Sequence, residues 1–284
     1  MAFGIGRSED FGAAFRRLIL EDIAAARAGL RDPNLTPEEA VHGARRRLKR
    51  IRSIIRILRP ALRSRYASYQ SEIRSVARSL AVHRDADVLH ATATDLRAAS
   101  NSGQRQFIER VIGSLDEGSR STRKRIAPAP VLLALSELEA DAEDLPRPRK
   151  GARLYRTAVM RAYRRGHRSM RRASKTHKAA DLHRWRKDAK DLWHLLEIAE
   201  RRLPGRLVRH AARLDTLAEI LGLDHDYWIT AEHMRAVVGD KANQEAAELL
   251  VAARRKRLQK DALRRGRKLY RKSPRAFRRI IRLR

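Results

Sequence analysis

The sequence VHGARRRLKRIRSIIRILRP, residues 41–60, carries apolar and basic residues in two separate helical patterns. The apolar residues recur every three or four positions: Val41, Ala44, Leu48, Ile51, Ile55 and Leu58. On an α-helix, which turns by about 100° per residue, such positions share one face. The stretch therefore predicts a helix that buries this face in a protein core.

A basic stripe runs beside the apolar face, one position farther along the chain. It consists of His42, Arg45, Lys49, Arg52 and Arg56, and is widened by Arg46 and Arg50. Because a helix rises about 1.5 Å per residue, the stripe extends over about 20 Å. Cations spaced by one helical turn repel one another by about 0.2–0.5 kcal/mol per pair. We therefore expect an anionic partner to offset this repulsion.

The composition of the whole chain also predicts a folded protein that binds polyanions. The 284 residues include 65 Lys and Arg against 33 Asp and Glu, which gives a net charge of +32. A protein so far from neutrality attracts polyanions. Disorder is the alternative for so charged a chain, but 43% of the residues are hydrophobic, and they follow a helical period.

The sequence excludes several kinds of site and segment. It contains no Cys, which rules out disulfide frameworks and Cys-ligated zinc or iron–sulfur sites. The N-terminus lacks the apolar core of a signal peptide, and no apolar run approaches the roughly 18 residues of a membrane span. We expect a cytoplasmic protein with no transmembrane segment and no cofactor.

Helical periodicity continues along most of the chain, and no stretch has the alternating pattern of a strand. The predicted helices cover residues 11–30, 36–60, 63–81, 89–96, 104–126, 152–174 and 181–203. Prolines and an acidic cluster mark residues 128–150 as a connector between two halves, residues 9–127 and residues 151–266. A basic tail follows at residues 267–284. The predicted fold class is all-α.

The second half repeats features of the first at a constant offset of 141 positions. The matching residues are His42 and His183, Arg45 and Arg186, Lys49 and Lys190, Leu80 and Leu221, and Asp85 and Asp226. Matches at one offset across two helices and a loop indicate an internal duplication. They predict two similar helical bundles.

These residues resemble the CHAD domain family, whose name stands for conserved histidine α-helical domain. The first family signature, a His followed by cations at helical spacing, is similar to His42, Arg45, Arg46 and Lys49. The second is similar to Leu182, His183, Arg186, Lys187, Lys190 and Glu197. A third motif, in which Leu-Gly ends a helix and an Asp opens the next, is similar to residues 80–88 and to Leu221, Gly222 and Asp226.

The chain departs from the family pattern at two places. Trp193 and His194 stand where Arg-Tyr is common, and Ala81 stands where Gly is common. The first departure removes one expected cation from the second basic stripe.

The resemblance covers residues 9–266 and implies two four-helix bundles related by pseudo-two-fold symmetry around a basic groove or pore. It further implies that the groove binds inorganic polyphosphate and that the protein associates with polyphosphate granules. We predict a ligand face made of His42, Arg45, Arg46, Lys49, Arg52, Arg56, His183, Arg186, Lys187 and Lys190.

Nonspecific binding of DNA or RNA is the main alternative function. Only 5% of the residues are aromatic, which leaves few platforms for stacking single-stranded bases. Asn and Gln, which read adenine, are also scarce. In the tail, Phe277, Ile280 and Ile281 would suit an amphipathic helix on an anionic membrane, further polyphosphate binding or a plain capping helix. We expect any contact of the tail with nucleic acid or a membrane to be weak.

The sequence does not predict an enzyme. It lacks the GxxxxGK[ST] loop of P-loop phosphotransferases. The ExExK motif of triphosphate-tunnel enzymes is approached at Glu137 and Glu139, but Asp141 stands in place of the Lys. We expect binding without catalysis.

Two His–Asp clusters admit a metal-binding interpretation: His83, Asp85 and Asp87, and Asp224, His225 and Asp226. Helix capping is favoured instead, with Asp85 and Asp226 accepting hydrogen bonds at the start of the following helices. The stripe residues His42 and His183 are expected to donate to phosphate rather than to ligate a metal. Nearby cations depress the pKa of such histidines and a bound polyanion raises it, so we expect binding to tighten below neutral pH.

Overall fold

The computed structural model of the chain describes residues 3–80, 84–122, 128–237, 241–281 and 283. Of the helical residues 84–87, 118–122 and 128 it describes the backbone alone. All regular secondary structure in these ranges is helical, which confirms the all-α prediction. The helices are α1 Phe11–Arg31, α2 Pro37–Leu62, α3 Arg65–Ser79, α4 Arg84–Ala98, α5 Ser102–Thr122, α6 Pro128–Glu143, α7 Gly151–Thr176, α8 Ala179–Ile198, the 3-10 turn η1 Glu200–Arg202, α9 Gly205–Met234, α10 Lys241–Leu269 and α11 Pro274–Arg278.

Local signals in the sequence fix where the first two helices begin. Asp10 caps α1 by accepting a hydrogen bond of 2.9 Å from its first turn. Thr36 and Glu39 form the predicted capping box at the start of α2. This helix continues through Pro60 and ends at Leu62, beyond its predicted end. A Pro in the last turn removes only its own hydrogen bond, and the buried side chain of Leu62 anchors that turn.

The predicted connector contains a helix, α6, that the sequence analysis did not predict. Its prolines fall in the first turn, where the missing N–H groups cost no hydrogen bond. The side chains that α6 buries against its neighbours α1 and α3 are Val131, Leu135, Leu138 and Ala142. An ion pair between Arg27 and Glu139 also ties α6 to α1. The acidic cluster of the connector therefore lies on a packed helix.

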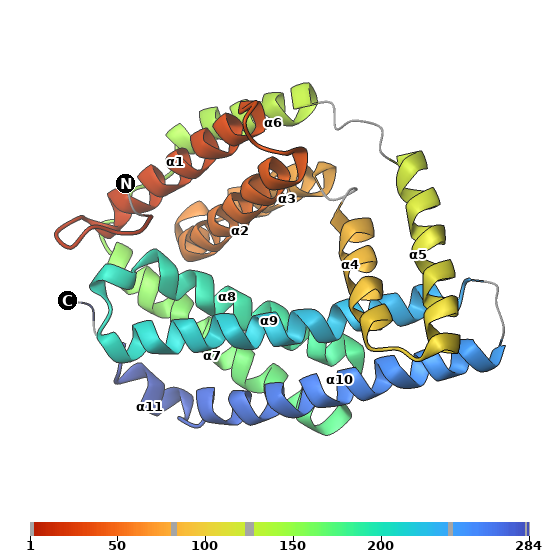
Figure 1. The fold of residues 1–284 in the computed structure, drawn as a ribbon. Helices are drawn as coiled ribbons and strands as arrows, with labels where there is room; N and C mark the ends of the chain where they lie inside the picture. The colour runs from red at the N-terminus through yellow and green to blue at the C-terminus, as the bar shows by residue number, and fades with distance from the viewer. Residues whose placement is uncertain (1–2, 81–83, 123–127, 238–240, 282, 284) are drawn as a thin grey trace.

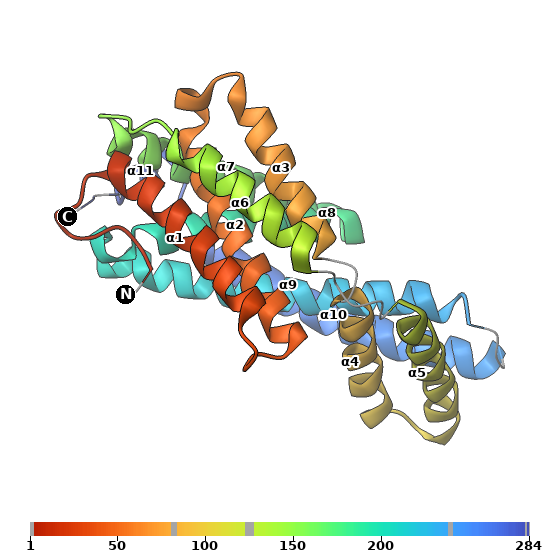
Figure 2. The same ribbon diagram turned by 90° about the horizontal axis from the view of Figure 1, so that it is seen from above.

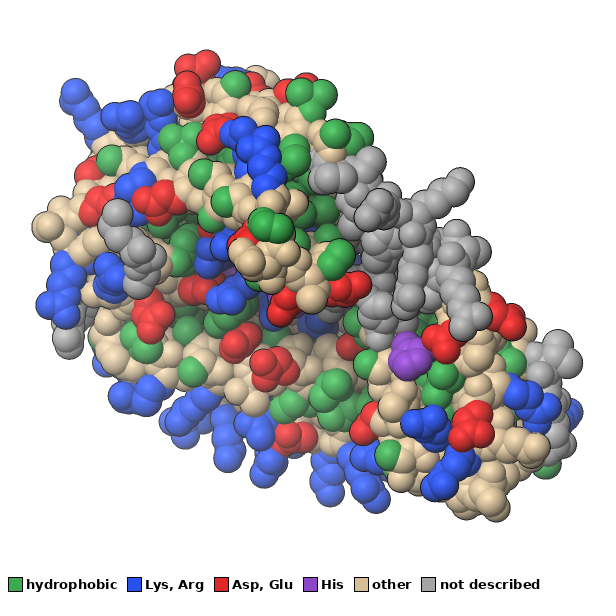
Figure 3. Space-filling view, turned by 45° about the horizontal axis from the view of Figure 1, so that its top comes forward, with side chains coloured by type: hydrophobic (Ala, Val, Ile, Leu, Met, Phe, Trp, Pro, Cys, Tyr) green, Lys and Arg blue, Asp and Glu red, His purple; other side chains and the backbone are tan. Residues whose placement is uncertain are grey.

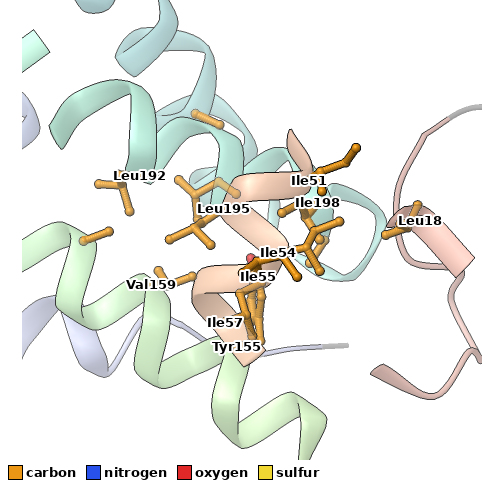
Figure 4. Packing of buried hydrophobic residues seen from close by; sticks show 14 of the residues in the cluster. Leu18, Ile51, Ile54, Ile55, Ile57, Tyr155, Val159, Leu192, Leu195 and Ile198 are labelled. Atoms are coloured by element: carbon orange, nitrogen blue, oxygen red, sulfur yellow. The ribbon is translucent and has the colours of Figure 1, made fainter. Parts of the chain in front are cut away.

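The helices form two groups that meet at α2. In Figures 1 and 2, α1, α2, α3 and α6 lie together, α7 to α10 form the second group, and α4 and α5 stand at one end. Figure 4 shows Ile54 and Ile55 of α2 near Val159 of α7 and near Leu195 of α8. The predicted apolar face of α2 is confirmed, because each of its six members is at most 8% exposed.

A second, smaller apolar core joins α4 and α5 to the C-terminal end of α9 and the N-terminal end of α10. Its buried residues are Ala93, Leu96, Phe107, Ile108, Val111, Leu115, Tyr227, Ala231, Met234, Ala247 and Val251. Two of these helices lie in the predicted first half and two in the second. The boundary between the two cores thus differs from the predicted boundary between the halves, because α9 and α10 are long enough to enter both cores.

The helix α9 is unbroken where the sequence predicted one helix ending and another beginning. Gly222 keeps a helical backbone, and the buried residues Leu221 and Tyr227 hold the helix on both sides of the expected break. Asp226 lies inside this helix, so its predicted role as an N-cap is wrong. The side chain of Asp85, to which the same role was assigned, lies outside the described residues.

The basic tail forms the end of α10 and the short helix α11. This agrees with a plain capping helix, one of the three interpretations predicted for it. Phe277 is 1% exposed and stacks on Tyr163 of α7 with 3.7 Å between ring centroids. The hydroxyl of Tyr163 donates to the carbonyl oxygen of Lys272 at 2.7 Å, and Ile281 is buried. The apolar side of the tail is therefore occupied by the protein itself, which argues against the membrane-surface helix. None of the described helices has the length and apolar character needed to cross a membrane.

Candidate anion-binding site

The two basic stripes lie next to the core on α2 and α8. The apolar positions of α8 that match Val41, Leu48, Ile51 and Ile55 of α2 at the offset of 141 are at most 1% exposed: Leu182, Ala189, Leu192 and Leu196. Among the predicted ligand residues, Arg45, Arg52, Arg56, His183, Arg186 and Lys190 are half-buried, whereas His42, Arg46, Lys49 and Lys187 are exposed. The half-buried cations contact water less than an ordinary surface Lys or Arg does. Water therefore competes less with an anion that binds them.

The two stripes converge around His194 of α8. Its ring is 4% exposed, and burial lowers its pKa, an effect to which the charges of Lys190 on α8 and Lys49 on α2 add. Arg46 also reaches from α2 to α8, where its Nη2 lies 3.7 Å from Oε1 of Glu197. Figure 3 shows the surface hollowed between the two groups of helices, with Lys and Arg side chains inside the hollow. We call the surface formed by the two stripes the basic groove.

The departure from the expected Arg-Tyr pair has a structural consequence. The ring of Trp193 lies beneath Lys190, whose Nζ is 4.7 Å from the ring centroid, so the indole attracts and orients that ammonium group. The next residue, His194, lies with its Nδ1 3.3 Å from Oε2 of Glu197. Burial alone would raise the pKa of Glu197, but the contact with His194 and the nearby arginines lower it overall. A position that lacks a cation thus holds a neighbouring one in place.

His183 belongs to a second cluster in the groove. Its ring lies against that of His225 of α9, with 4.0 Å between centroids, and His225 in turn stacks on Trp228. Burial lowers the pKa of His183 to about 4, and His225, Lys187 and Arg186 add to this effect. The imidazole is therefore neutral at pH 7 when no anion is bound.

Arg45 and Arg186 occupy matching positions but are held differently. Nη1 of Arg45 donates a hydrogen bond of 3.0 Å to the carbonyl oxygen of Leu80, just after α3. Arg186 instead packs against α9, where a Cβ on Gly222 would lie 3.2 Å from its Nε. Glycine at this position leaves the space that the guanidinium fills, which gives a physical reason for the Leu-Gly motif.

The structure places Arg52 and Arg56 in contacts within the protein. Nε of Arg52 lies 3.4 Å from Oε1 of Gln70 on α3, and Arg56 forms an ion pair with Asp191 of α8. Burial lowers the pKa of Arg56 to about 10, and the charge of Arg52 contributes. Arg50, which widened the predicted stripe, pairs with the buried Asp22 of α1. This end of the stripe helps to hold α2 against its neighbours, and a ligand role for Arg52 and Arg56 stays a prediction.

The two predicted His–Asp clusters differ in what the structure describes. The side chains of His83, Asp85 and Asp87 lie outside the described residues. In the other cluster, Asp224 is buried, pairs with Arg255 at 3.1 Å and accepts a hydrogen bond of 2.9 Å from Gln259. Across the described ranges, no group of three or more His, Asp or Glu side chains is arranged to hold a metal ion.

Two further arginines shape the groove and were missed by the sequence analysis. Arg165 of α7 pairs with Asp191 and lies 3.3 Å from Asp188, and the charge of Arg74 on α3 helps to lower the pKa of Arg52. In the sequence both arginines are ordinary members of polar helix faces. Only the packing of α3 and α7 against α2 and α8 brings them to the site.

Comparisons with known proteins identify the fold. The model of the CHAD domain family matches residues 14–235. Among solved structures, the chain is similar to the crystal structure of the CHAD domain from the plant Ricinus communis, with a TM-score of 0.68 and 19% sequence identity. That match covers 100% of this chain and 98% of the plant chain. A search of curated proteins gives no match.

Proposed function

Because the chain belongs to the CHAD domain family, which is associated with polyphosphate binding, we propose that it binds inorganic polyphosphate in the basic groove. The observation that carries the proposal is the convergence of Lys49 and Lys190 on His194. It brings cations of two helices that are far apart in the sequence to one region. Polyphosphate is a repeating anion without bases, so a ladder of Lys and Arg is sufficient to bind it through charge-assisted hydrogen bonds.

The helix order supports the proposed duplication behind this groove. When 141 is added to their residue numbers, α1, α2 and α5 begin within two residues of α7, α8 and α10. The basic helices α2 and α8 are then matching elements of two four-helix bundles related by a pseudo-two-fold axis. In this arrangement each bundle contributes one wall of the groove.

We further propose that the protein binds polyphosphate without hydrolysing or extending it. Catalysis on phosphoryl groups usually requires carboxylates that hold Mg²⁺. The carboxylates near the groove already face cations or imidazole: Asp191 pairs with Arg56, Glu197 lies against His194, and Asp215 lies 3.8 Å from Lys190. A cytoplasmic protein of this kind would gather on polyphosphate granules, which fluorescence microscopy of a tagged chain would reveal.

A competition titration tests the proposed ligand. Labelled long-chain polyphosphate is displaced by unlabelled polyphosphate, duplex DNA, RNA or heparin at one fixed physiological salt concentration, since polyanion affinities change steeply with salt. We expect polyphosphate to compete at far lower phosphate equivalents than the other three. Equal competition by all four would overturn the proposal and favour general polyanion binding, with nucleic acid as the partner.

A further inference from the structure

A compact basic pocket lies between α7 and α11, formed by residues outside the basic groove. Its volume is about 470 Å³, within the range of small-molecule sites. Five arginines line it: Arg153, Arg156, Arg161, Arg164 and Arg278. Met160 and Ile281 provide apolar surface between them. We call this site the α7–α11 pocket.

The fold explains why these arginines gather. On α7 they recur at helical spacing on the side opposite the buried residues Tyr155, Val159 and Ala162. The fifth arginine, Arg278, comes from the tail, because the stacking of Phe277 on α7 fixes α11 beside this face. The pocket therefore depends on the packing of the tail.

The described part of the chain does not balance the charges in this pocket. No acidic residue lines it, and none of its five arginines forms an ion pair with any described carboxylate. The neighbouring Arg165 on the same helix, in contrast, pairs with Asp188 and Asp191. Five unbalanced guanidinium groups around one hollow repel one another, and a bound anion would relieve that repulsion.

We propose that the α7–α11 pocket binds a short oligophosphate, such as tripolyphosphate, independently of the basic groove. Guanidinium groups bind phosphate oxygens through paired hydrogen bonds, and several of them around a small hollow suit phosphates that are only a few bonds apart. The groove offers an extended ladder, whereas the pocket offers a cluster. All five arginines are exposed, so an anion can reach them directly from solvent.

Calorimetric titration of the full chain with tripolyphosphate at fixed salt tests this proposal. The pocket variant is R156E/R161E, and its matched control is R168E/R171E, which makes the same charge change at exposed positions of α7 outside the pocket. A groove variant, R45E/K49E/R186E/K190E, removes the other site. We expect the groove variant to retain one binding event and the pocket variant to lose that event, with an affinity at least about a hundredfold weaker. The control should stay within about twofold of the unmodified chain.

If the pocket variant and its control lose the same affinity for tripolyphosphate, the proposal is overturned, because binding then depends only on the overall charge of the protein. Circular dichroism must first show that each variant keeps its helices, and R156Q/R161Q replaces the pocket variant if charge reversal unfolds it. Hydrogen exchange gives a second readout: tripolyphosphate should protect the backbone amides of α11 in the groove variant. The groove variant separates the two sites. If the pocket proposal is wrong, this variant does not bind tripolyphosphate, whereas if the groove proposal is wrong, it binds polyphosphate as well as the unmodified chain does.

Discussion

The two basic helices match at one end and have opposite charges at the other. Near their N-termini, His42, Arg45 and Lys49 of α2 correspond to His183, Arg186 and Lys190 of α8. Farther on, at the same offset of 141, Arg50 corresponds to Asp191 and Arg56 to Glu197. The acidic residues of α8 face arginines of α2: Asp191 pairs with Arg56, and Glu197 lies near Arg46.

This difference suggests separate roles in ligand binding and in helix packing for different residues of each helix. The matching cations of the two helices are the ones that we propose to bind an external anion. One cation of this set, Arg46, also lies 3.7 Å from Glu197 of α8. Where the charges are opposite, each helix supplies counterions to the other, and the contact holds α2 against α8. A charge ladder can thus serve as a binding surface and as a docking surface on the same helix face, depending on the residues opposite it.

The largest effect is expected from reversing the charges at the matching basic end. The groove variant R45E/K49E/R186E/K190E replaces four cations that we propose to bind phosphate, each worth about 1.5–3 kcal/mol in a charged hydrogen bond. We expect affinity for long-chain polyphosphate to fall by at least about a thousandfold while helicity is kept, since these positions lie off the apolar face. Fluorescence anisotropy and circular dichroism measure the two quantities.

A matched control is available on the outer face of α10. Lys256, Arg257, Lys260 and Arg267 are exposed and lie on one side of α10, so K256E/R257E/K260E/R267E changes the net charge by the same amount. This variant should lose much less affinity than the groove variant. If both lose the same affinity, binding follows net charge and the groove has no special role.

The opposite-charge end should affect stability rather than binding. Asp191 lies between Arg56 and Arg165 and is 11% exposed. Replacing it with Asn leaves two half-buried cations without their carboxylate, and we expect the free energy of unfolding to fall by about 2–4 kcal/mol. Urea denaturation with an unchanged m-value measures this loss.

Asp215→Asn provides the comparison for that experiment. Its carboxylate is 35% exposed and lies 3.8 Å from Nζ of Lys190, the geometry of a weak surface pair. We expect a loss of less than about 1 kcal/mol. Similar losses at Asp191 and Asp215 would contradict the docking role assigned to the opposite-charge end.

A smaller effect is expected where α8 packs against α9. Gly222→Ala would place a Cβ 3.2 Å from Nε of Arg186 and force the guanidinium to move. The matching position in the first half is Ala81, so the substitution makes the two halves alike. We expect affinity for polyphosphate to fall by about fivefold to tenfold, or roughly 1 kcal/mol, with little change in stability.

Gly113→Ala on α5 is the control, because a Cβ there would meet no atom within 4 Å. Ala is favoured over Gly in a helix, so this variant should be as stable as the unmodified chain or slightly more so, with unchanged affinity. An unchanged affinity in Gly222→Ala as well would show that the position of Arg186 does not matter for binding.

The sequence predicted the elements of the groove better than their surroundings. The apolar face of α2 and the stripe beside it follow from periodicity alone, because one helix determines which of its own residues share a face. The pairing of Arg56 with Asp191 and the approach of Arg165 could not be predicted in this way, since they depend on how α2 crosses α7 and α8.

The same limit explains two of the errors in the predicted elements. Prolines near residue 128 indicated a loop, yet in the first turn of α6 they are compatible with a helix whose apolar residues contact α1 and α3. At Asp226, the match to a motif indicated a helix start, but buried side chains on both sides keep α9 continuous. In both places tertiary packing decided between two local structures that the sequence allowed.

The smallest predicted effect concerns the pH dependence of binding. In the empty groove, burial and the neighbouring His225, Lys187 and Arg186 lower the pKa of His183 to about 4. A bound polyanion favours the charged imidazolium and raises this pKa, so the complex takes up a proton that the free protein does not hold. Affinity therefore increases as pH falls through the raised pKa and stops increasing near pH 4. Between pH 7 and pH 5 we expect the affinity for polyphosphate to increase about fourfold, measured by anisotropy at constant salt.

His183→Gln should reduce this increase in affinity, whereas His90→Gln, on the exposed surface of α4, should leave it intact. A gain that survives in His183→Gln would assign the proton to another group and separate the histidine of α8 from the binding mechanism.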